Sequence, residues 1–139
     1  MKKSIRRQRF TLIEVVVAIV IVVTLASVAA PLYLNYIKKA NVGAAKTQIK
    51  LIEDALTGYR LDIGSYPTGD AGLQSLVENS DNNEKWNGPY IKPAVPKDPW
   101  GNDYVYTCPG EHGDYDLVCY GADGQPGGEG DNADITNWE

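Results

Sequence analysis

The sequence predicts an α+β fold in which a long N-terminal transmembrane and amphipathic helix packs on a small C-terminal antiparallel sheet. Two observations lead to this prediction. Apolar residues recur at helical spacing through about the first sixty residues, and short alternating segments bounded by Gly and Pro turns follow them. The 139 residues are enough for this helix and one small domain, but not for two domains.

An uncharged stretch over residues 15–37 predicts that the first part of the helix crosses a membrane. Its 23 residues are rich in Val, Ile and Ala, and at about 1.5 Å per residue they span the hydrocarbon core of a bilayer. Pro31 lies inside this stretch and has no backbone N–H. We therefore expect a kink or local unwinding of the helix over residues 27–31.

A stripe of apolar residues predicts that the helix continues beyond the membrane and packs on the domain. The stripe consists of Ala45, Ile49, Ile52, Leu56 and Tyr59. Its spacings of four and three residues place all its members on one helix face. Gly64 is the expected stop signal, so the sequence predicts one helix over residues 10–62.

A short helix and three short strands are predicted after the long helix. The short helix is expected over residues 71–77, and the strands over residues 89–91, 103–108 and 115–120. In the middle strand, alternation places Tyr104, Tyr106 and Cys108 on one face of the sheet and Val105 and Thr107 on the other. These strands form the expected antiparallel sheet.

The charge distribution is asymmetric about the apolar stretch. Five of the 13 Lys and Arg residues lie within residues 1–9, where there are no acids, so eight remain against 18 Asp and Glu residues in the rest of the chain. Positive charge before the stretch and negative charge after it predict a cytoplasmic leader and an exterior domain. An acidic exterior domain also argues against nucleic-acid binding, which needs a basic surface.

The two cysteines, Cys108 and Cys119, both fall in the predicted exterior domain. An oxidising compartment would permit a disulfide between them, and two buried thiols are the alternative. A tight hairpin turning symmetrically over residues 110–113 would place Cys108 opposite Tyr115, too far from Cys119 for disulfide geometry. The bridge therefore requires an asymmetric loop, and the sequence leaves both arrangements open.

No known catalytic pattern occurs in the sequence, and an enzyme is not expected. Phosphate-binding glycine loops, Cys-x-x-Cys pairs and Gly-x-Ser-x-Gly signatures are all absent. The one histidine, His112, lies among turn-forming residues, which favours a turn residue over a general base. Trp100 lies in a similar segment, residues 98–101, interpreted as a turn whose Trp covers the core; a binding loop is the alternative.

A single carboxylate, Glu14, stands at the head of the apolar stretch. An acid in a membrane needs a partner, and one candidate is the α-amino group of a neighbouring chain cut before Phe10. A secretory signal peptide released near Ala30 is the alternative reading of the same segment. Glu14 itself, and the apolar pattern that continues to Ile37, argue against that alternative.

The segment Phe10-Thr11-Leu12-Ile13-Glu14 resembles the class III signal of type IV pilins and of type II secretion pseudopilins. The resemblance implies that a prepilin peptidase cuts between Arg9 and Phe10 and methylates the new amine. It also implies that Glu14 neutralises the amine of an adjacent subunit during filament assembly. The family has Gly before the cut where this chain has Arg9, so an uncut, membrane-held precursor is an alternative.

The last twenty residues interleave glycines with acids, a composition that fits either a calcium loop or a disordered tail. Carboxylate and carbonyl oxygens on a flexible backbone are the ligands that Ca²⁺ prefers. Trp138, close to the C-terminus, is expected to pack as a clasp that holds this loop closed.

Further segments extend the resemblance to the major pseudopilins of type II secretion. They are residues 59–68, 72–76, 88–91, 98–104, 109–113 and 121–124. The resemblance implies a pilin-like fold and a bound Ca²⁺, with side-chain ligands from Asp123 and Asp134, a third from Asp131, and main-chain carbonyls near Tyr120.

The implied function is that of a structural subunit of the type II secretion pseudopilus, a periplasmic filament that helps drive folded proteins across the outer membrane. Implied partners are identical subunits, minor pseudopilins, the inner-membrane assembly platform and the prepilin peptidase. Residues 1–9 are then the leader, 10–37 the transmembrane and filament-core helix, and 38–139 the periplasmic domain of a single-pass inner-membrane protein. A type IV pilin for adhesion, motility or DNA uptake, and a secreted soluble domain, are the alternatives.

Overall fold

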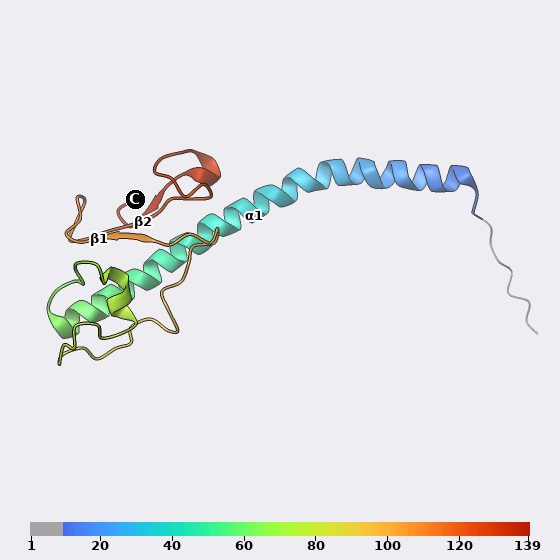
Figure 1. The fold of residues 1–139 in the computed structure, drawn as a ribbon. Helices are drawn as coiled ribbons and strands as arrows, with labels where there is room; N and C mark the ends of the chain where they lie inside the picture. Colours follow the sequence, from blue (N-terminus) through green and yellow to red (C-terminus); the bar gives the residue numbers. More distant parts are fainter. Residues whose placement is uncertain (1–9) are drawn as a thin grey trace, which may run out of the picture. The chain divides into compact units, whose positions relative to one another are not determined.

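The computed structural model describes residues 10–139. The chain divides into two compact units, one ending at Ile37 and one running from Lys38 to Glu139. A single helix, α1 (Leu12–Ile63), contributes residues to both units (Figure 1). The predicted leader, including Arg9 on the N-terminal side of the expected cut, lies outside the described residues.

The first unit is the apolar half of α1. Among the described residues, α1 is the one helix long and apolar enough to cross a membrane by length and composition. The helix is continuous through Pro31, so of the kink or local unwinding expected there, the unwinding is wrong. A proline removes only one backbone bond, here the one to the Ser27 carbonyl, and the neighbouring bonds keep the helix intact.

The second half of α1 carries the hydrophobic core of the domain. The predicted stripe is buried: Ala45, Ile52 and Leu56 are fully inaccessible, and Ile49 and Tyr59 nearly so. The helix ends at Ile63, where the Gly64 amide donates to the Arg60 carbonyl at 2.8 Å. Gly64 has a φ of +97°, a conformation that glycine adopts without strain, so the predicted stop is confirmed.

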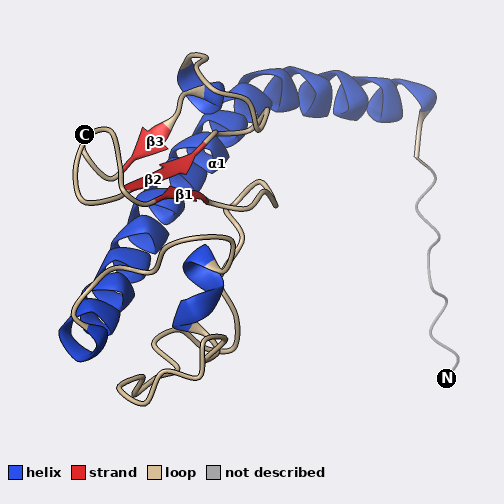
Figure 2. Ribbon diagram, turned by 60° about the vertical axis from the view of Figure 1, so that its left-hand side comes forward, coloured by secondary structure: helices blue, strands red, loops and turns tan. Residues whose placement is uncertain are grey.

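A three-stranded antiparallel sheet packs on this stripe (Figure 2). Its order is β1-β2-β3, formed by β1 (Val105–Thr107), β2 (Asp116–Cys119) and β3 (Ile135–Thr136). Leu117 and Ile135 from the sheet join Ile52 and Leu56 of α1 in one core. The predicted α+β fold is confirmed. The short helix expected over residues 71–77 is the 3₁₀-helix η1 (Gly72–Leu76).

The strand predicted at residues 89–91 is wrong, and β3 replaces it as the third strand. The amides of Tyr90 and Ile91 both donate to the Leu76 carbonyl, at 2.7 and 3.1 Å, which bends the chain instead of extending it along a neighbour. The residue that follows β3 also bonds to β2, since the Asn137 amide donates to the Leu117 carbonyl at 3.1 Å.

Strand β1 has the predicted alternation, with Tyr104 and Tyr106 toward the core and Val105 and Thr107 exposed. Thr107 pairs with Asp116, so the hairpin has the symmetric register that places residue 108 opposite residue 115. Of the two arrangements that the sequence left open, the structure has the free thiols, with Cys119 buried and Cys108 half-buried. The reason is the symmetric hairpin, which keeps Cys108 and Cys119 at different positions along the ladder.

Candidate assembly site and acidic loop

The head of α1 is closed by reciprocal hydrogen bonds between Thr11 and Glu14. A Glu14 carboxylate oxygen accepts from the Thr11 amide at 2.8 Å and from the Thr11 hydroxyl at 2.9 Å. The Glu14 amide in turn donates to the Thr11 hydroxyl oxygen at 3.3 Å. This is a capping box, which satisfies donors that a helix start otherwise leaves free. The Thr-x-x-Glu spacing is the sequence signal for this box, which was not among the predicted features.

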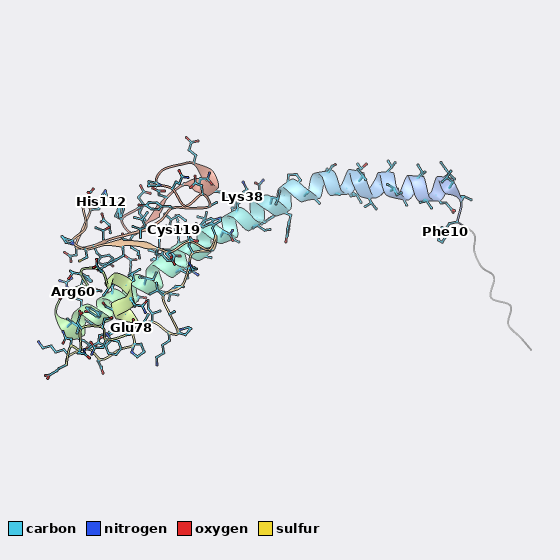
Figure 3. The ribbon with its side chains drawn as sticks, viewed as in Figure 1. Phe10, Lys38, Arg60, Glu78, His112 and Cys119 are labelled. Carbon is cyan, nitrogen blue, oxygen red and sulfur yellow. The ribbon has the colours of Figure 1, made fainter. Side chains whose placement is uncertain are left out.

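Glu14 therefore has a local partner within its own chain. Ile13, Val17 and Ile21 flank it on the helix surface, so the carboxylate lies in apolar surroundings. Phe10, the residue expected to carry the processed amine, is exposed (Figure 3). Both predicted assembly residues thus lie at the head of α1 and are open to other molecules.

The acidic loop, residues 120–134, joins β2 to β3. Residues 122–130 are exposed, whereas Gly121 is buried. The loop closes where the Ala122 amide donates to the Asp131 carbonyl at 2.9 Å, next to the 3₁₀-helix η2 (Gly130–Asn132). A Cβ on Gly121 would lie 2.7 Å from the Asp131 carbonyl oxygen and 3.0 Å from that of Ala133. Only glycine fits at this closure, where two carbonyl oxygens approach the chain.

The predicted calcium ligands lie in this loop, but each carboxylate has its own partner. Asp123 accepts from the Gln125 amide at 3.1 Å, and both oxygens of Asp134 accept from the Gly127 amide, at 3.0 and 2.9 Å. Asp131 pairs with Lys38 of α1 at 3.1 Å. Tyr120 is half-buried at the start of the loop.

The donor set of the acidic loop fits Ca²⁺ in kind. Every candidate ligand is a carboxylate or carbonyl oxygen, the hard donors that this ion takes from flexible loops. Within residues 10–139, no three His, Cys, Asp or Glu side chains are grouped closely enough to hold a metal by themselves. A calcium site here must therefore combine carboxylates with main-chain carbonyls, and those of Asp131 and Ala133 gather at Gly121.

The segment around Trp100 is a turn, as predicted. The Asp98 amide donates to the Asn102 carbonyl at 2.9 Å, and the Gly101 amide donates to the Asp98 carbonyl at 3.0 Å. Trp100 is half-buried against the core.

Burial raises the pKa of the Cys119 thiol to about 12. The thiol is therefore protonated and donates to the buried Asp98 carboxylate at 3.2 Å.

Trp138 does not clasp the acidic loop, so that prediction is wrong. Its ring stacks on His112 in the β1–β2 hairpin, with ring centroids 4.0 Å apart and planes 7° from parallel. The pairing of Asn137 with Leu117 explains this position, because it carries the C-terminus along β2 toward the hairpin. His112 is a turn residue, as predicted, and its Nδ1 lies 3.0 Å from Asp116.

The Asp116 carboxylate stabilises the hairpin turn by accepting hydrogen bonds from it. Its side chain is only 10% exposed, and it accepts from the amides of Glu111 at 2.9 Å and His112 at 3.2 Å. Burial acts to raise the pKa of Asp116, but the hydrogen bonds from the His112 ring and from these two amides outweigh it and hold the pKa below its ordinary value. The ionised carboxylate is thus the form that the fold stabilises.

An exposed apolar helix followed by a small domain built on the same helix defines a membrane-anchored subunit of the pilin-like class. Residues 32–138 match the family model described as type II secretion system (T2SS), protein G. The chain belongs to this family.

Curated relatives match over nearly the whole chain. The type II secretion system core protein G of Vibrio cholerae is 50% identical over 141 residues, covering 99% of this chain and 96% of that protein. The protein of the same name from Escherichia coli K12 is 45% identical, covering 99% and 95%. That from Pseudomonas aeruginosa is 42% identical, covering 96% and 98%.

A solved structure supports the same assignment. The crystal structure of the major pseudopilin from the type 2 secretion system of enterohaemorrhagic Escherichia coli is similar with a TM-score of 0.61 at 35% identity, covering 76% of this chain and 92% of that one. The predicted role as a structural subunit of the type II secretion pseudopilus, and not an enzyme, is confirmed. Membership of this family and the apolar helix make the chain a membrane-anchored periplasmic protein.

Proposed function

We propose that identical copies of this chain polymerise through the apolar half of α1 into a periplasmic filament that helps drive folded proteins across the outer membrane. The observation that carries this proposal is the exposure of that half. Its large hydrophobic side chains, from Phe10 to Ile37, are between 40% and 82% exposed. Such a surface needs a bilayer before assembly and other helices after it.

The orientation that we propose is a single pass through the inner membrane with the domain in the periplasm. The charge asymmetry supports it, because five basic residues precede the apolar stretch and the domain that follows is acidic. Minor pseudopilins and the inner-membrane assembly platform are the proposed partners of the growing filament. Family membership supports these two partners. No single contact within the described residues points to them.

We propose that a prepilin peptidase cuts between Arg9 and Phe10, methylates the new amine, and thereby completes the assembly site. Glu14 then exchanges its bonds to Thr11 for the amine of a neighbouring subunit. The capping box supports this step, because it satisfies the Glu14 carboxylate in the single chain, where an unpaired ion in the membrane would cost several kcal/mol. Filament assembly then only replaces one set of hydrogen bonds by another.

The mature N-terminus tests the proposed processing. Protein extracted from native membranes is examined by intact mass and N-terminal sequencing. An N-methylated Phe10 is expected. A start near Ala30 would overturn the proposal in favour of a secreted domain, and retained Met1 would show an uncut anchor.

Substitution of Glu14 tests the assembly step. Glu14→Ala is expected to insert in the membrane but to yield no filaments on shearing and pelleting. Thr11→Ala removes the two hydrogen bonds of the Thr11 hydroxyl while keeping the Glu14 carboxylate, so it is the matched control and is expected to retain filaments. Normal filaments from Glu14→Ala would refute the proposed role of Glu14.

We propose that the acidic loop binds one Ca²⁺ through Asp123, Asp134 and main-chain carbonyls near Tyr120, with Asp131 as a further ligand. The charge of the loop supports this, because its acids outnumber the one cation paired with them among residues 10–139, Lys38. A bound cation would neutralise the loop and fix its backbone.

Thermal unfolding tests the calcium site. The midpoint of wild type is expected to rise with Ca²⁺ and fall with a chelator, whereas that of Asp123→Ala is not. Unchanged midpoints in wild type would remove calcium from the proposal.

A further inference from the structure

The buried Asp98 carboxylate holds the turn over residues 98–102 in place. Asp98 is only 5% exposed, and one of its carboxylate oxygens accepts from the amides of Trp100 at 3.0 Å and Asn102 at 2.8 Å. Its other oxygen accepts from the Cys119 thiol at 3.2 Å, which fastens the turn to β2. All of these partners are buried or half-buried. The backbone of Asn102 therefore has a fixed position relative to the sheet.

The side chain of Asn102 reaches from this fixed turn to the start of the acidic loop. Its amide nitrogen donates to the Gly121 carbonyl at 3.3 Å. The three outer atoms of the same carboxamide lie 3.4 to 3.5 Å from the position that a Cβ on Gly124 would take. The Asn102 side chain thus bonds the loop at Gly121 and lies beside Gly124, so it reaches both sides of Asp123.

The Asn102 side chain meets the loop at two of its glycines. Gly121 and Gly124 have φ values of +64° and +66°, and residues 122–130 are exposed. Glycines have the most conformational freedom to lose on ordering. A bond from outside the loop to Gly121 therefore restrains a residue with more freedom to lose than a β-branched residue would have.

We propose that Asn102 is a positioning residue that sets the backbone of the acidic loop and so pre-arranges Asp123 and the nearby carbonyls for a cation. The cation-binding part of this inference rests on the calcium proposed above, whereas the positioning of the loop does not. Pre-arranged ligands bind more tightly because less ordering remains to be done on binding.

The first test measures the loop without calcium. Hydrogen exchange of the Ala122 amide, which closes the loop onto Asp131, is followed in the full chain in detergent with a chelator present. Asn102→Ala is expected to speed exchange about fivefold, the effect of one lost neutral hydrogen bond. Asn79→Ala is the matched control, because Asn79 makes the same kind of bond to a carbonyl, that of Asn83. Equal exchange in wild type and Asn102→Ala would overturn the inference.

The second test measures Ca²⁺ itself on the same samples by titration calorimetry. Asn102→Ala is expected to bind about fivefold more weakly, with a thermal midpoint in chelator close to that of wild type. Asn102→Asp, which replaces the donor by an acceptor facing the Gly121 carbonyl, is expected to show faster Ala122 exchange than Asn102→Ala does.

The outcomes separate the two proposals. If wild type binds no Ca²⁺, the calcium proposal fails while the exchange data still decide the positioning role. If wild type binds and Asn102→Ala binds equally well, or loses thermal stability in chelator by as much as it loses affinity, Asn102 is only a structural residue and the inference is wrong.

Discussion

The two halves of α1 show how one helix serves two environments. In the second half, the apolar stripe of Ala45 to Tyr59 is covered by the domain, with exposures of 7% or less. In the first half, side chains of the same kind remain open, such as Leu25 at 66%. Both halves form regular helix, so helix propensity does not distinguish them. The difference lies in which molecule covers the apolar surface.

Polar groups follow the same division. In the first half, Thr24 and Ser27 donate to carbonyls of their own helix, those of Val20 and Thr24, so they need no outside partner in an apolar environment. In the domain, the buried Asp98 carboxylate is bonded across elements, to Cys119 of β2. The domain thus covers its apolar stripe within a single copy, whereas the apolar side chains of the first half stay exposed in a single copy.

The largest expected effect comes from removing a core side chain in the second half. Leu56 is fully buried, so Leu56→Ala is expected to lower the free energy of unfolding of the domain by about 2 to 5 kcal/mol. Chemical denaturation of the full chain in detergent, followed by tryptophan fluorescence, measures it. Leu25→Ala is the matched control in the first half and is expected to leave this value unchanged. Equal losses from both substitutions would break the comparison.

The next effect concerns the buried carboxylate that fixes the turn. Asp98→Ala leaves the amides of Trp100 and Asn102 without their acceptor, which is expected to cost about 1 to 3 kcal/mol of domain stability. Asp103→Ala, at an exposed carboxylate paired with Lys97, is the control and should change stability by less than about 1 kcal/mol. A loss no larger than that of the control would show that the turn is held by Trp100 packing alone.

What could be predicted from the sequence depended on how local the cause was. The stripe on α1 and the stop at Gly64 follow from neighbours within a few turns, and both were predicted correctly. Two predictions were wrong: a strand was expected at residues 89–91, and β3 was not expected. Both errors concern contacts between residues that lie far apart in the sequence. A two-residue strand such as β3 is set by its pairing with Cys119 and Val118, which its own sequence does not encode.

The candidate site shows the same limit. The acidic residues and Glu14 could be chosen from residue type and spacing, and the capping box of Thr11 with Glu14 is a local pattern that was overlooked. The partners that fix the acidic loop, Lys38 and Asn102, lie far from it in the sequence. Neither residue stands out by type, so only the folded chain reveals that they contact the loop.

Acid sensitivity provides a smaller test, within the domain alone. The pKa of Asp116 is held below its ordinary value of 3.8. A depressed pKa stabilises the fold above the unfolded value and loses that contribution as the pH falls through the folded value. The stability difference between wild type and Asp116→Asn is therefore expected to shrink as the pH is lowered from about 5 to about 3. Asp103→Asn is the exposed control. A difference that grows on acidification would contradict this assignment.

The smallest effect is expected at Lys38, the first residue of the second unit. Its ion pair with Asp131 ties the acidic loop to α1, but the two side chains are 54% and 24% exposed, so water and salt screen the pair. Lys38→Gln should therefore lower domain stability by less than about 1 kcal/mol, and the loss should vanish at about 1 M salt.

Lys39→Gln is the control for this pair, because Lys39 makes no ion pair among residues 10–139. The Ca²⁺ affinity of Lys38→Gln separates two roles for Asp131. If Asp131 is a ligand of the proposed ion, freeing it from Lys38 removes a competitor and raises the affinity. If Asp131 serves only to tether the loop to α1, the affinity falls, since the loop loses an anchor at the residue where the self-contained domain begins.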